Sequence, residues 1–243
     1  MFRFYFLMIT SLPWVIYYIV KAAHQAKHPE KFSEEVNYAL AQRLIAFIKK
    51  RGKITTQVFG AENLPEEGGY VMYSNHQGRY DALGIMGGHS RPCAVVMDSR
   101  RARMPISNEF INLIKGKRLI KTDPRQQVKV MQEIAEELKE GRRYLLFPEG
   151  GYTDNRNTIQ PFHAGSFKCA QKACCPLVPV VIWDSYKPFG EKGLKPVQTQ
   201  VHFLKPISYE SYAGKSTADM RDMVQEKIAA KLDELAAAME ESA

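Results

Sequence analysis

The chain has 243 residues, of which 45% are hydrophobic and 25% charged, and its formal net charge is +8 at pH 7. That length fits one domain with an appendage and is enough to bury a core. The composition is that of an ordinary globular protein and argues against wholesale disorder. The 4 cysteines form no C-x-x-C pair. We therefore expect reduced thiols and no metal site.

The positive charge is concentrated in two stretches of the chain. Residues 1–53 and residues 91–125 each hold nine Lys or Arg against three acidic residues, whereas acidic residues predominate after Thr217. The first basic stretch includes the most apolar part of the chain. This combination suits an anionic lipid surface, where each basic residue contributes about 1 kcal/mol. No nucleic-acid-binding motif accompanies the charge, so we expect no nucleic-acid partner.

The amino-terminal segment from Phe4 to Val20 contains no charged residue. As a helix it would be about 26 Å long, slightly shorter than the hydrocarbon core of a bilayer. Pro13 should kink or divide this helix. A cleaved signal peptide, a spanning helix, a buried core helix and a shallow anchor are the alternatives, and the length and the proline favour the anchor. The basic residues downstream predict that the rest of the chain lies on the cytoplasmic face of the membrane.

A second helix is predicted to begin at Ser33, an N-cap residue followed by two glutamates. It is predicted to end at Lys49-Lys50-Arg51-Gly52, where a cationic last turn precedes a glycine. The sequence thus predicts a membrane-associating helical pair over residues 1–52 and an α/β domain with a C-terminal helix over residues 53–243.

After Gly52, short apolar runs alternate with helical patterns. The predicted strands are Ile54–Phe59, Tyr70–Ser74, Ala94–Met97, Arg118–Ile120, Tyr144–Phe147, Val178–Trp183 and Val201–Leu204. The predicted helices cover about Tyr80–Gly87, Asn108–Ile114, Gln126–Lys139, Ala164–Lys172 and Ala218–Met239. This alternation indicates an α/β fold with a mixed, largely parallel sheet covered by helices. Ligands of such sheets bind at strand ends, in the loops that lead into helices.

The first candidate site is the turn from Ser74 to Asp81, which follows an apolar strand and opens a helix. With His76 on the incoming turn and Asp81 one turn inside the helix, the carboxylate can reach the imidazole. Such a pair fixes the tautomer of the ring and raises its basicity, as deprotonation of a hydroxyl requires. A His and an Asp at this spacing also occur often by chance.

A second candidate site is the segment from Tyr144 to Gly151, in which an apolar strand ends in proline, an acid and two glycines. Gly150 and Gly151 allow backbone N–H groups to approach a phosphate or a carbonyl closely. Glu149 is suited to bind substrate hydroxyls or to organise the loop. A plain tight turn is the ordinary alternative.

A third candidate site lies between Gly116 and Arg125. Lys121 and Arg125 are suited to clamp a phosphate, the lysine as a point charge and the arginine through a bidentate grip. A solvated loop is the alternative here.

Together these segments resemble the 1-acylglycerol-3-phosphate acyltransferase family, within the glycerolipid acyltransferase superfamily. Asn75, His76 and Asp81 match its hallmark of Asn-His, four residues and Asp. The other matching segments are Phe59–Pro65, Phe147–Gly150, Pro161–Lys168 and Val178–Val180, and all of them occur in the family's order between about residues 55 and 210. The two predicted helices before the domain resemble the membrane-seating element of bacterial members.

Two segments depart from the family pattern. Lys121 occupies the place of the Arg that the family uses for glycerol phosphate. Gly151 and Tyr152 replace the usual Thr-Arg, and the nearest downstream cation is Arg156. Both departures concern recognition of the headgroup, so the acyl transfer is better supported than the identity of the acceptor.

The resemblance implies direct transfer of an acyl chain without an acyl-enzyme. His76 would take the proton of an acceptor hydroxyl as it attacks a thioester of coenzyme A or acyl-carrier protein, which serves as co-substrate, and no cofactor or metal is needed. Asn75, Lys121, Arg125, Glu149, Gly150, Gly151 and Arg156 are the expected substrate-binding residues. The expected acceptor is 1-acylglycerol-3-phosphate, within a membrane lipid surface and as a step of phospholipid biosynthesis.

Alternatives of other kinds remain at this stage. They are an acyltransferase for another lyso-lipid headgroup, a non-catalytic lipid-binding membrane module, and a thioester or lipid hydrolase, although no G-x-S-x-G nucleophile motif is present. The basic run from Arg100 to Arg103 suits an acidic carrier surface as well as the phosphates of coenzyme A or of lipid.

Overall fold

The computed structural model describes residues 2–241. The strands are β1 Ile54–Phe59, β2 Tyr70–Ser74, β3 Ala94–Asp98, β4 Lys117–Leu119, β5 Arg143–Leu146, β6 Leu177–Trp183 and β7 Val197–Phe203. The helices are α1 Phe2–Thr10, α2 Leu12–Lys27, α3 Glu34–Gly52, α4 Asp81–Gly88, α5 Ser99–Ala102, α6 Ser107–Leu113, α7 Pro124–Lys139, α8 Lys168–Ala173, α9 Lys187–Gly190, α10 Tyr209–Tyr212 and α11 Thr217–Glu240, with 3₁₀ turns η1 Ala61–Asn63 and η2 Ala164–Phe167.

The strands form one 7-stranded sheet in the order β1-β7-β6-β2-β5-β3-β4. Neighbouring strands are parallel except β6 and β7, which pair antiparallel. The predicted α/β fold with a mixed, largely parallel sheet is therefore confirmed. Because β2, β5 and β6 are adjacent and parallel, the residues that follow each of them meet at one edge of the sheet.

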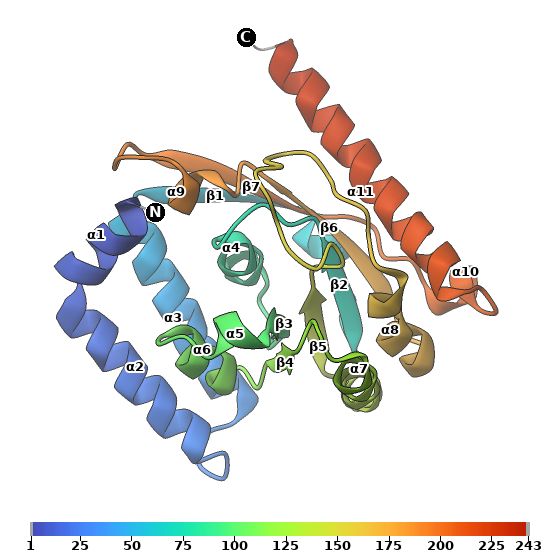
Figure 1. The fold of residues 1–243 in the computed structure, drawn as a ribbon, viewed down its shortest axis with the longest axis horizontal. Coiled ribbons are helices and arrows are strands. Elements are labelled where there is room, and N and C mark those ends of the chain that lie inside the picture. The colour runs from blue at the N-terminus through green and yellow to red at the C-terminus, as the bar shows by residue number, and fades with distance from the viewer. Residues whose placement is uncertain (1, 242–243) are drawn as a thin grey trace.

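Helices cover both faces of the sheet, as Figure 1 shows. Successive side chains along β2 point to opposite faces of the sheet. Val71 and Tyr73 pack in a core with residues of α7, α8 and α11. Tyr70 and Met72 point the other way, into a core with residues of α3, α4 and α6. All five residues of β2 are buried. Strands that are covered on both faces are continuously apolar, which is the pattern seen here.

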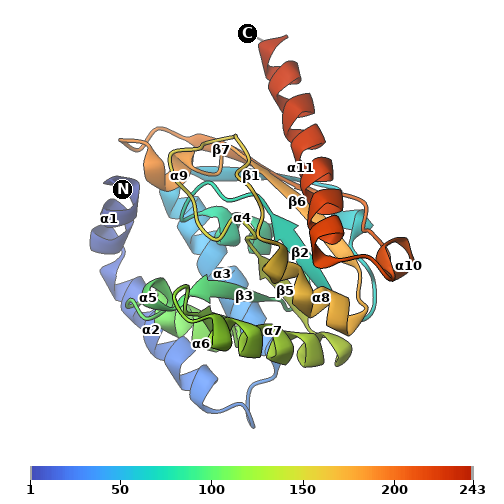
Figure 2. The ribbon, with the colours of Figure 1, turned by 45° about the vertical axis from the view of Figure 1, so that its right-hand side comes forward.

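The amino-terminal apolar segment is divided into α1 and α2, whose axes differ by 85°. The break falls at Ser11, and Pro13 stands in the first turn of α2, where the missing N–H of proline costs no hydrogen bond. The predicted division at Pro13 is thus observed. Within residues 2–241 no single helix has the length and hydropathy to cross a membrane, and only α1 and α2 taken together pass that test. Figure 2 shows these two helices on the opposite side of the sheet from α11.

The short helices α5, α9 and α10 were not predicted, because four residues are too few to establish a periodic pattern. The start of α4 also differs from the expectation. Asp81 is the first residue of this helix rather than lying one turn inside it. Its carboxylate is therefore directed back at the turn that precedes the helix, where unpaired backbone N–H groups are available.

Candidate active site

The turn between β2 and α4 brings together the histidine and the aspartate of the sequence motif. Nδ1 of His76 lies 2.6 Å from Oδ2 of Asp81. The Asp81 side chain is fully buried, whereas 16% of the His76 side chain is exposed. The pair therefore consists of a buried carboxylate and an imidazole that is partly exposed at the surface.

Two aromatic side chains hold the His76 ring in place. The Phe147 ring is stacked on it with the centroids 4.3 Å apart. The Tyr152 ring approaches edge-on, with a centroid distance of 4.6 Å. When the Nδ1–H donates to Asp81, the lone pair of the ring is on Nε2, for which no hydrogen-bond partner is found between residues 2 and 241. This nitrogen is free to accept a proton from a ligand.

The Asp81 carboxylate accepts hydrogen bonds on both oxygens. Oδ2 also receives the backbone N–H groups of Gln77 at 2.6 Å and Gly78 at 2.8 Å. Oδ1 receives the hydroxyl of Ser185 at 2.7 Å. Burial of a carboxylate is costly unless its lone pairs are satisfied, and these donors meet that requirement. They also fix the direction in which Oδ2 faces the imidazole.

The turn between β2 and α4, residues 75–80 (the catalytic turn), is joined to the end of β6 by two amide side chains. Asn75 accepts the N–H of Ile182 at 2.9 Å and donates to its carbonyl oxygen at 3.0 Å. Gln77 donates to the same carbonyl at 2.9 Å and accepts the N–H of Ser185 at 2.9 Å. Asn75 therefore has a structural position, behind His76, rather than one facing a substrate. The hydrogen bonds fix the turn to the neighbouring strand.

Glu149 lies behind the catalytic turn on the segment that follows β5. Its Oε1 accepts the backbone N–H of His76 at 3.0 Å and its Oε2 accepts the side-chain amide of Gln160 at 2.7 Å. Burial raises the pKa of this carboxyl to about 7. Gly150 next to it has a φ of +70°, a conformation that favours glycine. These contacts fit the organising role for Glu149 that the sequence offered as one of two alternatives.

The three predicted phosphate-binding cations lie in different places. A methyl group added to Gly151 would be 3.2 Å from Nζ of Lys121, so this ammonium lies against the glycine turn. Arg125 is exposed in the first turn of α7. The guanidinium of Arg156 is 5.8 Å from the ring of Tyr186 and 3.7 Å from the carboxylate of Asp154. Lys121 thus lies beside the glycine turn after β5, whereas Arg156 follows Asn155, whose side-chain amide donates to the carbonyl oxygen of His76 at 3.1 Å.

Arg101 is a further cation near His76 that was not among the predicted site residues. Its guanidinium carbon lies 4.7 Å from the centre of the Tyr152 ring, whose edge meets the imidazole. In the described part of the chain no acidic side chain forms an ion pair with the guanidinium of Arg101. The run of arginines at Arg100–Arg103 was visible in the sequence, but its distance from His76 was not.

Several uncharged polar residues of the site were missed by the sequence analysis: Gln77, Asn155, Asn157, Gln160 and Ser185. Asn157 accepts from Gln77 at 3.0 Å and from the N–H of Asp184 at 2.8 Å. Ser185 closely follows β6, a strand in which all seven residues are buried. Polar residues directly after such a strand are a usable signal, because parallel neighbours bring them to the edge where β2 and β5 also end.

An imidazole held by a buried carboxylate, with its second nitrogen unpaired at the edge of an α/β sheet, is the arrangement that enzymes with a histidine general base use. The chain belongs to the Acyltransferase family, whose model matches residues 55–183. This span includes His76, Asp81, Glu149 and the end of β6. The protein is therefore an acyltransferase.

The named relatives point to the same family. The chain is 28% identical over 233 residues to 1-acyl-sn-glycerol-3-phosphate acyltransferase alpha of Ovis aries, an alignment that covers 92% of this chain and 78% of the relative. It is 29% identical to the protein of the same name from Homo sapiens, covering 92% and 79%. The crystal structure of the 1-acyl-sn-glycerophosphate (LPA) acyltransferase, PlsC, from Thermotoga maritima has the same fold, with a TM-score of 0.79, 23% identity and coverage of 97% and 94%.

Proposed function

We propose that this acyltransferase moves a fatty acyl chain from an acyl thioester to the free hydroxyl of 1-acylglycerol-3-phosphate at a membrane surface. The observation that carries the proposal is the contact of 2.6 Å between His76 and the fully buried Asp81. The names of the relatives support this acceptor. Coenzyme A and acyl-carrier protein are both suitable thioester donors.

In the proposed reaction His76 acts first as base and then as acid. Nε2 takes the proton of the acceptor hydroxyl while that oxygen forms a bond to the thioester carbonyl carbon. The tetrahedral intermediate then loses its C–S bond, and the proton passes from Nε2 to the departing thiolate. Asp81 stabilises the imidazolium that exists between these two steps. The acyl chain is never attached to the protein.

The oxyanion of the intermediate requires hydrogen-bond donors. The N–H groups of Gln77 and Gly78 at the helix start are already used by Asp81, and the N–H of Gly150 donates to Phe147. The N–H of Gly151 has no acceptor within residues 2–241. We therefore assign the oxyanion to Gly151, whose lack of a side chain also leaves space for the substrate.

The acceptor phosphate is assigned to the two cations next to His76. Lys121 lies against Gly151, and Arg101 lies over Tyr152. The aromatic face orients the guanidinium without neutralising it, so its N–H groups stay available to a phosphate. Arg101 in this position would supply the charge that the family's Thr-Arg provides and that Gly151 and Tyr152 lack.

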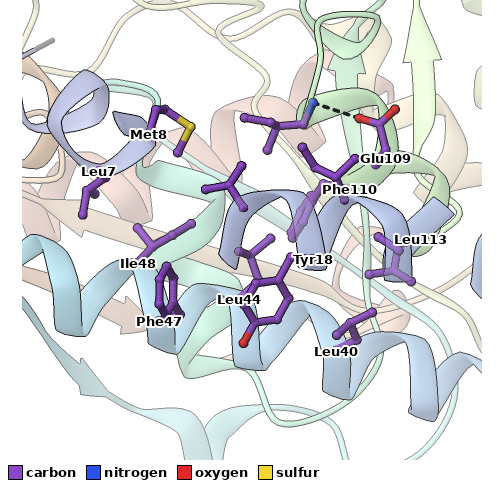
Figure 3. Close-up of a pocket in the computed structure, with 14 residues that line it drawn as sticks. Leu7, Met8, Tyr18, Leu40, Leu44, Phe47, Ile48, Glu109, Phe110 and Leu113 are labelled. Carbon is purple, nitrogen blue, oxygen red and sulfur yellow. Dashed lines mark hydrogen bonds between the residues drawn. The ribbon is translucent and has the colours of Figure 1, made fainter. Parts of the chain in front are cut away.

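An apolar pocket between the amino-terminal helices and α6 is suited to the acyl chain (Figure 3). The cavity itself is about 40 Å³, and the space between the lining residues reaches about 590 Å³ only when open solvent is included. The residues that line it come from α1, α2, α3 and the segment of α6: Leu7, Met8, Val15, Tyr18, Ile19, Ala22, Leu40, Leu44, Phe47, Ile48, Ile106, Glu109, Phe110 and Leu113. Leu7 also packs in one cluster with Tyr80, the residue before Asp81. Leu7 thus links the lining of the pocket to the hydrophobic cluster at the start of α4.

The apolar surface of α1 and α2 is assigned to the membrane. Its large hydrophobic side chains are each about half exposed or more, and they are Phe2, Tyr5, Ile9, Leu12, Trp14, Ile16, Tyr17 and Val20. Exposed apolar area of this extent on two bent helices suits insertion into the headgroup region, with Trp and Tyr at the boundary.

The proposal is tested by incubating the purified protein with a panel of lyso-lipids and with both thioester donors. We expect the diacyl product from 1-acylglycerol-3-phosphate and slower transfer to lyso-lipids with other headgroups. A preferred acceptor of another headgroup would overturn the substrate assignment. Rapid release of free fatty acid without an acceptor would instead indicate a hydrolase.

A further inference from the structure

Ser185 supplies a hydrogen bond to the catalytic carboxylate from outside the motifs that resemble the family. Its hydroxyl donates to Oδ1 of Asp81 at 2.7 Å, across 104 residues of sequence. The side chains of both residues are buried, with Ser185 2% exposed. Because this buried serine donates to one specific acceptor, substitutions can test the effect of its hydrogen bond separately from the effect of its packing.

The two oxygens of Asp81 accept hydrogen bonds from different parts of the chain. Oδ2 faces three donors, all from the catalytic turn: the ring of His76 and the backbone of Gln77 and Gly78. Within residues 2–241 Oδ1 is hydrogen-bonded to Ser185 alone. Without that hydroxyl Oδ1 would be buried and unpaired, and only the contacts of Oδ2 would oppose rotation of the carboxylate about its Cβ–Cγ bond. Rotation would move Oδ2 away from Nδ1.

The segment that carries Ser185 is itself held on two sides. The N–H of Ser185 donates to Gln77 at 2.9 Å. Farther along, the carbonyl oxygen of Pro188 accepts from the buried guanidinium of Arg3, in α1, at 2.8 Å. The hydroxyl therefore approaches Asp81 from a fixed backbone, which is what a positioning group requires.

We infer that Ser185 is a positioning residue for acyl transfer, because it aims the Asp81 carboxylate at His76 without touching either substrate. The inference rests on the proposed function for its kinetic test only. The geometry of the His76–Asp81 hydrogen bond can be measured on the folded protein without turnover.

The experiment compares the full-length wild-type protein with Ser185→Ala and Ser185→Thr. Alanine removes the donor, and threonine keeps it. For Ser185→Ala we expect kcat to fall about tenfold with both KM values unchanged, since a lost hydrogen bond to a buried carboxylate is of that order. Ser185→Thr should recover most of kcat. Ser185→Cys, with a weaker donor of similar size, should lie between the two and serves if the alanine variant does not fold.

A spectroscopic measurement makes the inference independent of activity. A proton shared between imidazole and carboxylate gives a low-field ¹H resonance, which is assigned to Nδ1 of His76 by its loss in His76→Gln. We expect this resonance to move or broaden in Ser185→Ala and to be retained in Ser185→Thr. An unchanged resonance, or a threonine variant as slow as the alanine variant, would overturn the inference. Failure of the wild-type protein to transfer acyl chains would overturn the proposed function and leave this measurement valid.

Discussion

The sheet edge that carries His76 and the amino-terminal helices α1 and α2 differ in which side chains they bury and which they expose. At the sheet edge, polar groups are buried and hydrogen-bonded, as the donors around Asp81 illustrate. In α1 and α2, large apolar side chains such as Trp14 and Ile9 are exposed. The first arrangement depends on individual atoms at fixed distances, because proton transfer does. The second would depend on total apolar area, because the adsorption to a lipid surface that we propose for these helices does.

The two regions also differ in how completely their buried polar atoms are paired. Among residues 2–241, four buried side-chain N or O atoms have no hydrogen-bond partner, and three of them belong to Arg3, Gln25 and Asn37 of the first three helices. None belongs to the catalytic turn. A catalytic group tolerates little displacement, whereas the membrane contact proposed for α1 and α2 would need no such precision. Single substitutions should therefore have large effects at the sheet edge and graded effects in the helices.

The largest expected effect is that of His76→Ala. We expect kcat to fall at least about 10³-fold, because a general base contributes on the order of 10² to 10⁴ and the same group also serves as acid. The Tm should change little, since Asp81 keeps its other donors. His28→Ala, which changes an exposed histidine after α2, is the matched control and should retain full turnover. A transfer assay measures kcat, and a thermal melt shows whether the variant is folded. Turnover in His76→Ala would contradict the mechanism.

Lys121→Ala should raise the KM for the acceptor about tenfold and leave kcat nearly unchanged, as the loss of a ground-state phosphate contact does. Arg125→Ala is the matched control from the same basic segment and should change KM less, because Lys121 lies against Gly151 whereas Arg125 lies farther along, in the first turn of α7. Initial rates over a range of acceptor concentrations separate the two parameters. A fall in kcat alone would exclude the binding role.

The double variant Trp14→Ala with Tyr17→Ala should weaken binding to anionic vesicles about tenfold, since each ring removes part of the apolar area that can be buried in lipid. Met239→Ala in α11 is the control, because this side chain is 51% exposed and Trp14 is 58% exposed. Sedimentation with vesicles measures the bound fraction. Equal losses in both variants would show that exposed apolar area anywhere on the molecule, rather than these helices, governs adsorption.

The smallest expected effect is a pH-dependent difference in stability between the wild-type protein and Glu149→Gln. Burial raises the pKa of Glu149 to about 7, so the folded state holds this proton more tightly than the unfolded state. The stabilisation is fully present below the unfolded pKa and is lost as the pH rises through about 7. Thermal melts from about pH 5 to about pH 8 should therefore show a wild-type Tm that falls relative to that of the variant. Parallel curves would contradict a titration of Glu149 in this range.

Much of the architecture could be predicted from local patterns. β1 and β2 lie at the predicted residues, and the segment from Phe4 to Val20 divides near Pro13. Apolar runs and proline act on residues close to them in the chain, so their structural effects can be predicted from the sequence. The contact of His76 with Asp81 was accessible for the same reason, since both lie in one turn.

The position of the cations could not be predicted in this way. Lys121, Arg125 and Arg156 were indistinguishable as charges, yet only the first has a contact beside Gly151. Arg101 reaches Tyr152 because β3 pairs with β5, so the segments that follow these two strands lie close together. Which loops meet depends on the order of the strands, and no short-range signal encodes that order.

The sequence by itself determined an α/β sheet, an apolar amino terminus and an imidazole with a carboxylate in the turn after β2, because each depends on residues close together in the chain. Only the tertiary structure decided that Ser185 holds Asp81, that Glu149 holds the backbone of His76, and that Arg101 lies over Tyr152 and Lys121 against Gly151. These contacts depend on β6, β2, β5 and β3 being neighbours in one sheet, which is a consequence of packing over the whole domain.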